Sequence, residues 1–187
     1  GGDFLGGVFN GVFDFHQIGL ANGIEGRHEG LLARVLQCDN SPMIVEHNVP
    51  LQSHNTFGIS AKALQWVRLH SEADLHAVLA DEGLRAQSKF ILGGGSNIVL
   101  TGDVKALVLK VEMKGMRVVG ETARDWLVEA AAGESWHDLV KWTLAQGLPG
   151  LENLALIPGT VGAAPVQNIG AYGLELQDRF HELDAVD

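Results

Sequence analysis

The chain has 187 residues, 46% of them hydrophobic, and a formal net charge of -10 at pH 7. This length and apolar content are sufficient for one domain with a hydrophobic core of its own. The acidic balance disfavours a nucleic acid or an anionic membrane as a partner, because both would repel it. Cys38 is the only cysteine, which excludes an internal disulfide, and the eight histidines show no zinc-ligand spacing. We therefore expect no metal site.

No apolar run is long enough to span a membrane, and the first residues lack the basic start of a signal peptide. We expect a cytoplasmic protein and a monomer. Residues 1–42 contain four phenylalanines and many glycines but no methionine, whereas Met43 opens a segment typical of a natural N-terminus. Within this stretch, residues 29–37 have the pattern of a short amphipathic helix. We interpret residues 1–42 as an extension outside the fold and residues 43–187 as the domain.

Two segments of this domain carry helix signals. The first covers residues 72–82, begins after a capping box at Ser71 and should end at Gly83. The second lies between Ser135, a typical N-cap, and Gly147. Its apolar face consists of Trp136, Leu139, Val140, Thr143 and Leu144.

Strand signals alternate with these helices. The predicted strands cover residues 64–69, 89–92, 106–111, 116–119, 126–130 and 181–187. Short strands interleaved with two helices predict an α+β fold that begins with a βαβ unit.

Residues 93–97 read Gly-Gly-Gly-Ser-Asn and follow the strand predicted for residues 89–92. Glycine permits positive φ and a close approach of bare backbone amides to an anion, so this turn is a candidate phosphate cradle. A dinucleotide fingerprint would need glycine at Ile98, and a P-loop would need Gly-Lys-Ser/Thr, so neither motif is present. A tight turn without a ligand explains the run equally well.

Residues 158–173 form a second segment of small and apolar residues, in which Gln167 and Asn168 are the polar exceptions. A buried glycine-rich loop is the simple explanation. Two such segments in one chain also suit a flat ligand with a polar tail, which would lie between them.

Five short segments together resemble a known family. They are Asn55-Thr56-Phe57-Gly58, Leu92-Gly93-Gly94-Gly95-Ser96-Asn97, Gly147-Leu148-Pro149-Gly150-Leu151-Glu152, Ile157-Pro158-Gly159-Thr160-Val161-Gly162 and Gln167-Asn168-Ile169-Gly170-Ala171-Tyr172-Gly173. In this order and spacing the chain resembles the UDP-N-acetylenolpyruvoylglucosamine reductases, from about Met43 to its last residue. One departure is Ala163-Ala164, where many members carry glycine or serine pairs, so a hydroxyl contact to the flavin would be absent.

The resemblance implies the FAD-binding domain of the vanillyl-alcohol-oxidase type, with two small α/β subdomains and an incomplete C-terminal end. It implies an NADPH-dependent flavoprotein oxidoreductase that reduces UDP-N-acetylglucosamine enolpyruvate to UDP-N-acetylmuramate for peptidoglycan and cell wall synthesis. The family's arginine, serine proton donor and glutamate lie later in its sequence than the matched segment. We therefore assign no catalytic residue and expect the 187 residues alone to be inactive. Glu152 is interpreted as a loop anchor, and Asp178 with Arg179 as a surface ion pair.

The resemblance also implies which residues bind FAD. Gly93, Gly94, Gly95, Ser96 and Asn97 should bind the diphosphate, chiefly through main-chain amides. The flavin and ribityl side should be lined by Ile157, Pro158, Gly159, Gly162, Ala163, Ala164, Ile169 and Gly170. Tyr172 either faces the substrate or is a buried tyrosine that closes the core.

Two other functions remain open at this point. An FAD-dependent oxidase of the same fold would usually show a histidine or cysteine for covalent flavin attachment near the glycine turn, and none is there. A gene fragment that folds poorly would bind nothing. Purification with bound yellow flavin would separate this last possibility from the other two.

Overall fold

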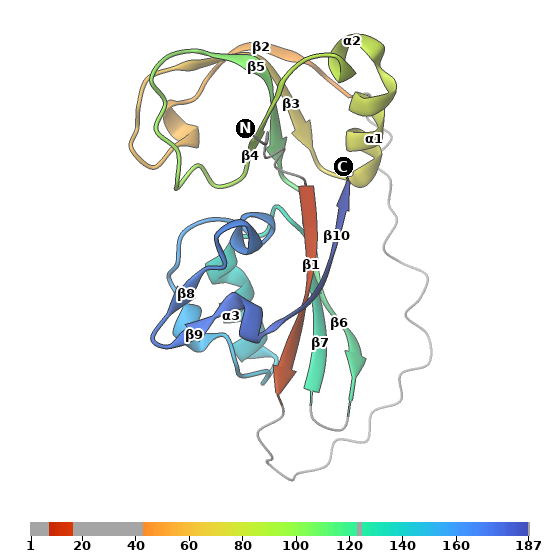
Figure 1. Cartoon of the computed structure of the whole chain (residues 1–187), viewed down its shortest axis with the longest axis vertical. Coiled ribbons are helices and arrows are strands. Elements are labelled where there is room, and N and C mark those ends of the chain that lie inside the picture. Colours follow the sequence, from red (N-terminus) through yellow and green to blue (C-terminus); the bar gives the residue numbers. More distant parts are fainter. Residues whose placement is uncertain (1–7, 17–42, 123–124, 187) are drawn as a thin grey trace, which may run out of the picture.

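The computed structural model describes residues 8–16, 43–122 and 125–186. Two lobes are visible, one above the other (Figure 1). Each lobe contains a four-stranded sheet, in the order β2-β3-β5-β4 in the first and β10-β1-β7-β6 in the second. The mixture of segregated sheets and short helices confirms the predicted α+β class.

The first lobe pairs three parallel strands with one antiparallel strand at the edge. Two helices connect β3 to β4, and β5 lies between these two strands in the sheet, so the predicted βαβ unit is confirmed. Its elements are β2 (Glu46–Pro50), β3 (Lys62–Leu69), α1 (Glu72–Ala80), α2 (Glu82–Arg85), β4 (Lys89–Leu92) and β5 (Val104–Val111).

Both faces of the first sheet carry buried hydrophobic residues: successive side chains of a strand point to opposite faces, and the neighbours Trp66 and Val67 are both fully buried. On one face, Val67 and Leu69 of β3 belong to a core with Leu75 and Val78 of α1. On the other face, Trp66 is fully buried in a second core, whose other members are Leu51, Ala61, Ala63, Leu92, Leu100 and Val108.

The predicted first helix is divided into α1 and α2 at Asp81. Its start is confirmed, since Ser71 and Asp74 form the expected capping box. Asp81 has an extended backbone, with ψ 114°, and its carboxylate accepts a hydrogen bond from the amide of Leu84 at 2.9 Å. This aspartate therefore ends α1 and caps α2. Gly83 lies within α2, so the expectation that it stops the helix is wrong.

The second lobe combines an antiparallel sheet with α3 and several 3-10 turns. Its sheet strands are β1 (Val8–His16), β6 (Met116–Glu121), β7 (Asp125–Ala130) and β10 (Phe180–Val186). A small hairpin is formed by β8 (Gly170–Ala171) and β9 (Leu174–Glu175). The core between this sheet and the turns includes Val128, Trp136, Leu154 and Val161.

The helix α3 (Trp136–Ala145) follows its predicted pattern closely. The Ser135 side chain accepts a hydrogen bond from the amide of Asp138, and Gly147 adopts φ 75° just after the helix. The predicted apolar face is buried, with the exception of Leu144, which is 47% exposed. None of the helices in the described residues has the length and apolar character needed to cross a bilayer.

Strand β1 differs from the expectation that residues 1–42 lie outside the fold. It pairs antiparallel with β10 on one side and with β7 on the other. Its sequence, Val-Phe-Asn-Gly-Val-Phe-Asp-Phe-His, is rich in residues that favour strands, and a position between two strands gives its backbone partners on both sides. The helix predicted over residues 29–37 lies outside the described residues.

Deletion of residues 1–42 tests the place of β1. Without β1, the backbone groups of β7 and β10 that pair with it would lose their partners, so we expect the melting temperature to fall by more than about 5 °C. Circular dichroism melting of both chains measures this change. An unchanged melting temperature would support an extension outside the fold and a domain that begins at Met43.

Candidate functional site

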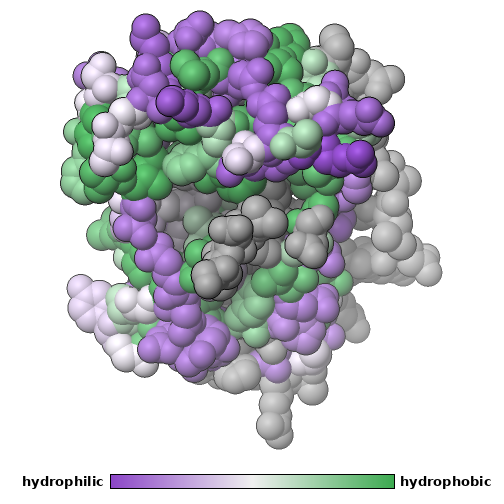
Figure 2. Space-filling view, turned by 45° about the horizontal axis from the view of Figure 1, so that its top comes forward, coloured by the Kyte–Doolittle hydropathy of each residue, from purple (hydrophilic) through white to green (hydrophobic). Residues whose placement is uncertain are grey.

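A cavity of about 360 Å³ lies between the two lobes. One wall consists of residues 91–98, which include the glycine turn, and the opposite wall comes from residues 158–169. The space-filling view shows hydrophobic surface on the side of the first lobe next to the hollow between the lobes (Figure 2). The two segments singled out in the sequence therefore line one cavity.

The glycines of the turn allow close contact between protein segments. A Cβ atom at Gly95 would lie 2.0 Å from the carbonyl oxygen of His54, and Gly95 also has φ 69°. A Cβ atom at Gly93 would lie 2.6 Å from Oγ1 of Thr160. The space next to these two glycines is thus filled by protein, so packing also requires their missing side chains.

The amides of the turn remain available to a ligand. No acceptor in the described part of the chain takes a hydrogen bond from the amides of residues 94–97. The carbonyl groups of the same turn are engaged: Gly93 accepts from Nζ of Lys110, and Gly95 accepts from the amide of Thr56 at 3.1 Å. The turn therefore combines anchored carbonyl groups with free N–H donors, as an anion-binding nest requires.

The opposite wall is attached to the start of α3 by backbone hydrogen bonds. The amide of Trp136 donates to the carbonyl of Gly159 at 3.1 Å, and the amide of Val161 donates to Glu134 at 2.9 Å. The 3-10 turn Val161–Gln167 follows and buries Val161 and Ala164 in the core. These contacts attach the second wall to the lobe that carries it.

A side-chain hydrogen bond joins the two walls. Nδ2 of Asn97 donates to Oε1 of Gln167 at 3.0 Å. We expected the side-chain amide of Asn97 to assist in binding the diphosphate, but one of its N–H donors is engaged by the other wall. Sequence reasoning noted Gln167 only as a polar exception and did not assign it to the site.

Most of the predicted cofactor residues line the cavity. All five residues from Gly93 to Asn97 do so, together with Pro158, Gly159, Gly162, Ala163, Ala164 and Ile169. Ile157 and Gly170 are not part of the lining. Sequence reasoning missed the lining residues Ile91, Leu92, Ile98, Val111, Ala132, Trp136, Thr160, Val166 and Gln167.

Tyr172 lies outside the lining as well. It forms the turn between β8 and β9, has φ 52° and is 89% exposed. The alternative of a buried tyrosine is therefore excluded. A large residue with positive φ is unusual, and such strain is concentrated at functional sites, so the substrate contact stays a prediction.

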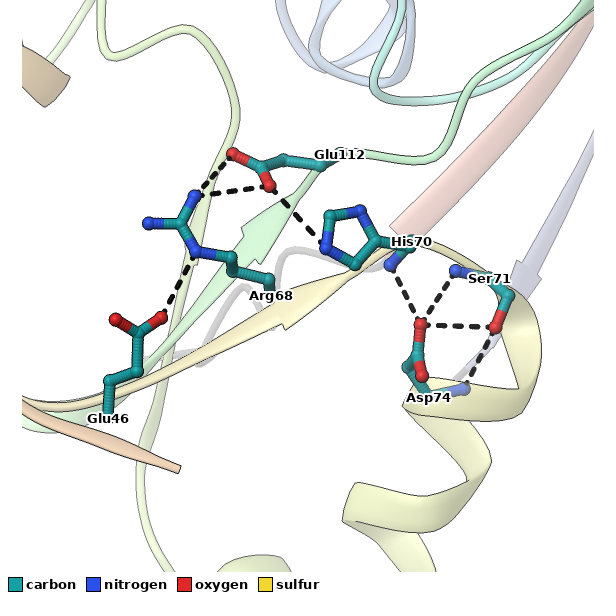
Figure 3. Close-up of polar contacts among 6 residues, drawn as sticks. All are labelled: Glu46, Arg68, His70, Ser71, Asp74 and Glu112. Atoms are coloured by element: carbon teal, nitrogen blue, oxygen red, sulfur yellow. Dashed lines mark hydrogen bonds and ion pairs between the residues drawn. The ribbon is translucent and has the colours of Figure 1, made fainter. Parts of the chain in front are cut away.

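A charged cluster lies on the first sheet (Figure 3). The Arg68 guanidinium donates to Glu46 and to Glu112, each at 3.1 Å, and His70 lies 3.8 Å from Glu112. Burial, followed by the nearby positive charge of Lys110 and then of Arg68, lowers the pKa of His54. This shift favours the neutral form of the His54 ring, whose centroid lies 4.8 Å from that of the Trp66 ring.

Two further expectations concern the charged loop residues. The Glu152 carboxylate accepts from the amide of Gly150, which confirms its role as a loop anchor. Arg179 donates to the carbonyl groups of Gly150 and Asp178, and the Asp178 carboxylate accepts from the amide of Glu175 at 3.0 Å. Within the described residues Asp178 and Arg179 form no ion pair, so that interpretation is wrong.

Comparison with known proteins identifies the class. The model of the FAD binding domain family matches residues 63–187, and the chain belongs to this family. The match confirms the expected cofactor, FAD.

The similar proteins of known name are reductases. The chain is 55% identical over 150 residues to "UDP-N-acetylenolpyruvoylglucosamine reductase" of Azoarcus sp. (strain BH72), covering 78% of this chain and 43% of that protein. It is 59% identical over 138 residues to the protein of the same name from Cupriavidus pinatubonensis, covering 74% and 41%. The chain thus spans less than half the length of these relatives.

A solved structure supports the fold. The crystal structure of UDP-N-acetylenolpyruvylglucosamine reductase (MurB) from Thermus caldophilus matches with a TM-score of 0.56 at 27% identity, over 73% of this chain and 46% of that one. The predicted fold, a FAD-binding α+β domain, is therefore confirmed.

The residues at the cavity fit FAD. Free backbone amides at residues 94–97 suit a diphosphate, and the largely apolar opposite wall suits a flat ring system.

Substitutions at Gly95 and Ser96 together distinguish a packing role from a ligand contact. Gly95→Val places a branched side chain against the His54 carbonyl at positive φ, so it should lower the melting temperature and abolish FAD binding together. Ser96→Ala should leave the melting temperature unchanged and weaken FAD binding by about 1 kcal/mol. Melting curves and FAD titrations measure both effects.

Gly102→Val is the matched control, because a Cβ atom at Gly102 meets nothing within 4 Å. This control should resemble the wild type in both assays. A Gly95→Val protein with wild-type stability would contradict the packing role assigned to Gly95.

Proposed function

We propose that this chain is the FAD-binding part of an NADPH-dependent reductase that converts UDP-N-acetylglucosamine enolpyruvate to UDP-N-acetylmuramate. The supporting observation is the 55% identity over 150 residues to a protein named as this reductase. The segment that the FAD binding domain family matches, residues 63–187, contains both walls of the cavity. We also propose that the protein is a cytoplasmic monomer, where its nucleotide substrates are soluble.

In this proposal the two walls divide the work of binding FAD. The amides of Gly94, Gly95, Ser96 and Asn97 bind the diphosphate, since they have no other acceptor in the described chain. The largely apolar wall orients the isoalloxazine and excludes water from it, through Pro158, Gly159, Gly162, Ala163, Ala164 and Ile169. Ile157 and Gly170 act by positioning this wall, and Tyr172 contacts the substrate from the hairpin.

FAD, when bound, supplies the hydride chemistry between NADPH and the enolpyruvyl double bond. The chain's own contribution at the cavity is binding and orientation. Its lining residues within the described chain carry apolar, hydroxyl, indole or amide side chains and no carboxylate, imidazole, amine or thiol. In this proposal the proton that completes the reduction comes from the serine of the resembling family, which lies later in its sequence than the segment matched here.

The same composition argues against an oxidase with covalently attached flavin. Such an enzyme needs a histidine or cysteine next to the isoalloxazine, and the lining formed by the described residues contains neither. The matched relatives cited above are named as reductases.

FAD titration tests the binding proposal. Adding the chain to FAD should change the flavin fluorescence, and excess FAD should raise the melting temperature because it binds only the folded state. No fluorescence change at high protein concentration would contradict the proposal and would favour a fragment that binds nothing.

NADPH consumption tests the assignment of the remaining chemistry. Because a positioned general acid typically contributes about 10² to 10⁴ in rate, we expect no substrate-dependent turnover from these residues alone. Dithionite should still bleach any bound flavin, which separates cofactor binding from turnover. Clear NADPH consumption that depends on the enolpyruvyl substrate would show that a catalytic group lies within this chain.

A further inference from the structure

Two carbonyl groups of the glycine turn, those of Gly93 and Gly95, are anchored by hydrogen bonds. Nζ of Lys110 donates to the carbonyl of Gly93. The backbone amide of Thr56 donates to the carbonyl of Gly95 at 3.1 Å, with the Thr56 hydroxyl 3.5 Å away. Two alternate peptide groups of one turn are therefore held by residues from distant parts of the chain.

Planarity of the peptide links each anchor to a donor. In a trans peptide the carbonyl and the following N–H point in opposite directions. A contact that fixes the Gly93 carbonyl therefore fixes the direction of the Gly94 amide. The contact to the Gly95 carbonyl fixes the Ser96 amide in the same way. Both amides belong to the group with no acceptor in the described chain.

Lys110 is well placed to hold its contact. It lies on β5 in register with Leu92, the last residue of β4 before the turn. The side chain is half-buried, and this burial lowers the pKa of Lys110. Its neighbour Arg68 is already paired with Glu46 and Glu112, so Lys110 is the cation that contacts the turn.

We propose that Lys110 is a positioning residue for the FAD diphosphate. It orients the Gly94 amide through the Gly93 carbonyl and places a positive charge behind an anion-binding turn. The inference rests on the proposed function, since it requires FAD to bind at this turn. It assigns a role to a residue outside the cavity lining.

The test compares FAD affinity in three variants. Lys110→Met removes the donor and the charge, and should weaken FAD binding about tenfold or more, as expected for a hydrogen bond to a charged group. Lys110→Arg keeps both and should restore most of the affinity. Lys114→Met is the matched control, because Lys114 also donates to a glycine carbonyl, that of Gly133, at 2.6 Å. This control should bind FAD as the wild type does.

Riboflavin provides a readout that a general structural defect would not reproduce. It shares the isoalloxazine and ribityl groups with FAD but has no phosphate. Lys110→Met should therefore lower the affinity for FAD and leave the affinity for riboflavin unchanged. If the wild type binds FAD, two results would overturn the assignment: Lys110→Met loses affinity for both ligands equally, or it loses no affinity for FAD. Failure of the wild type to bind FAD would instead overturn the proposed function, and the assignment with it.

A pH titration keeps the inference testable if Lys110→Met does not fold. The charged groups around Lys110 are Glu112, which favours its ammonium form, and Arg68 and Lys114, which oppose it. Because burial lowers the pKa of Lys110, its ammonium group loses a proton at a lower pH than an ordinary lysine does. FAD affinity of the wild type should then fall in alkaline solution, while Lys110→Arg keeps its affinity. Parallel pH profiles would contradict the role of the ammonium group.

Discussion

The site depends on the close approach of the glycine turn to two other segments. The turn lies against the backbone at His54 on one side and against Gly159 and Thr160 on the other. A side chain at Gly93 or Gly95 would collide with these neighbours, so the glycines are required for packing before any ligand binds. Because the contact with Gly159 and Thr160 joins residues of different lobes, it also determines where the cavity between the lobes lies. The proposed diphosphate cradle is thus a consequence of how protein segments pack against each other.

Electrostatic attraction at this turn comes from backbone dipoles and one lysine, although the whole chain carries a formal charge of -10. Amides without acceptors provide local positive potential without any charged side chain in the cavity lining. Lys110 contacts the turn from outside this lining, and the acidic residues near it are engaged with Arg68. A strongly acidic protein can therefore offer an anion site, since the relevant field is local.

Features set by neighbouring residues were predictable from the sequence, whereas features set by distant contacts were not. The cap at Ser135, the strand before the glycine turn and the two walls of the cavity follow from local patterns, and the structure has them. The break at Asp81 was missed because a short extended link with its own side-chain cap competes with a continuous helix. Thr160 and Gln167 were missed because their roles arise from contacts with the other wall, more than sixty residues away. The family resemblance singled out many of the residues that line the cavity, but it could not show that Tyr172 is exposed on a hairpin or that Lys110 anchors the turn.

We propose that backbone amides of the glycine turn bind the diphosphate of FAD. Nuclear magnetic resonance of the ¹⁵N-labelled chain tests it directly, because each amide gives its own signal. Addition of FAD should shift the amide signals of Gly94, Gly95, Ser96 and Asn97 strongly, and riboflavin should shift them much less. Binding of FAD that leaves these four signals in place would show that the diphosphate lies elsewhere.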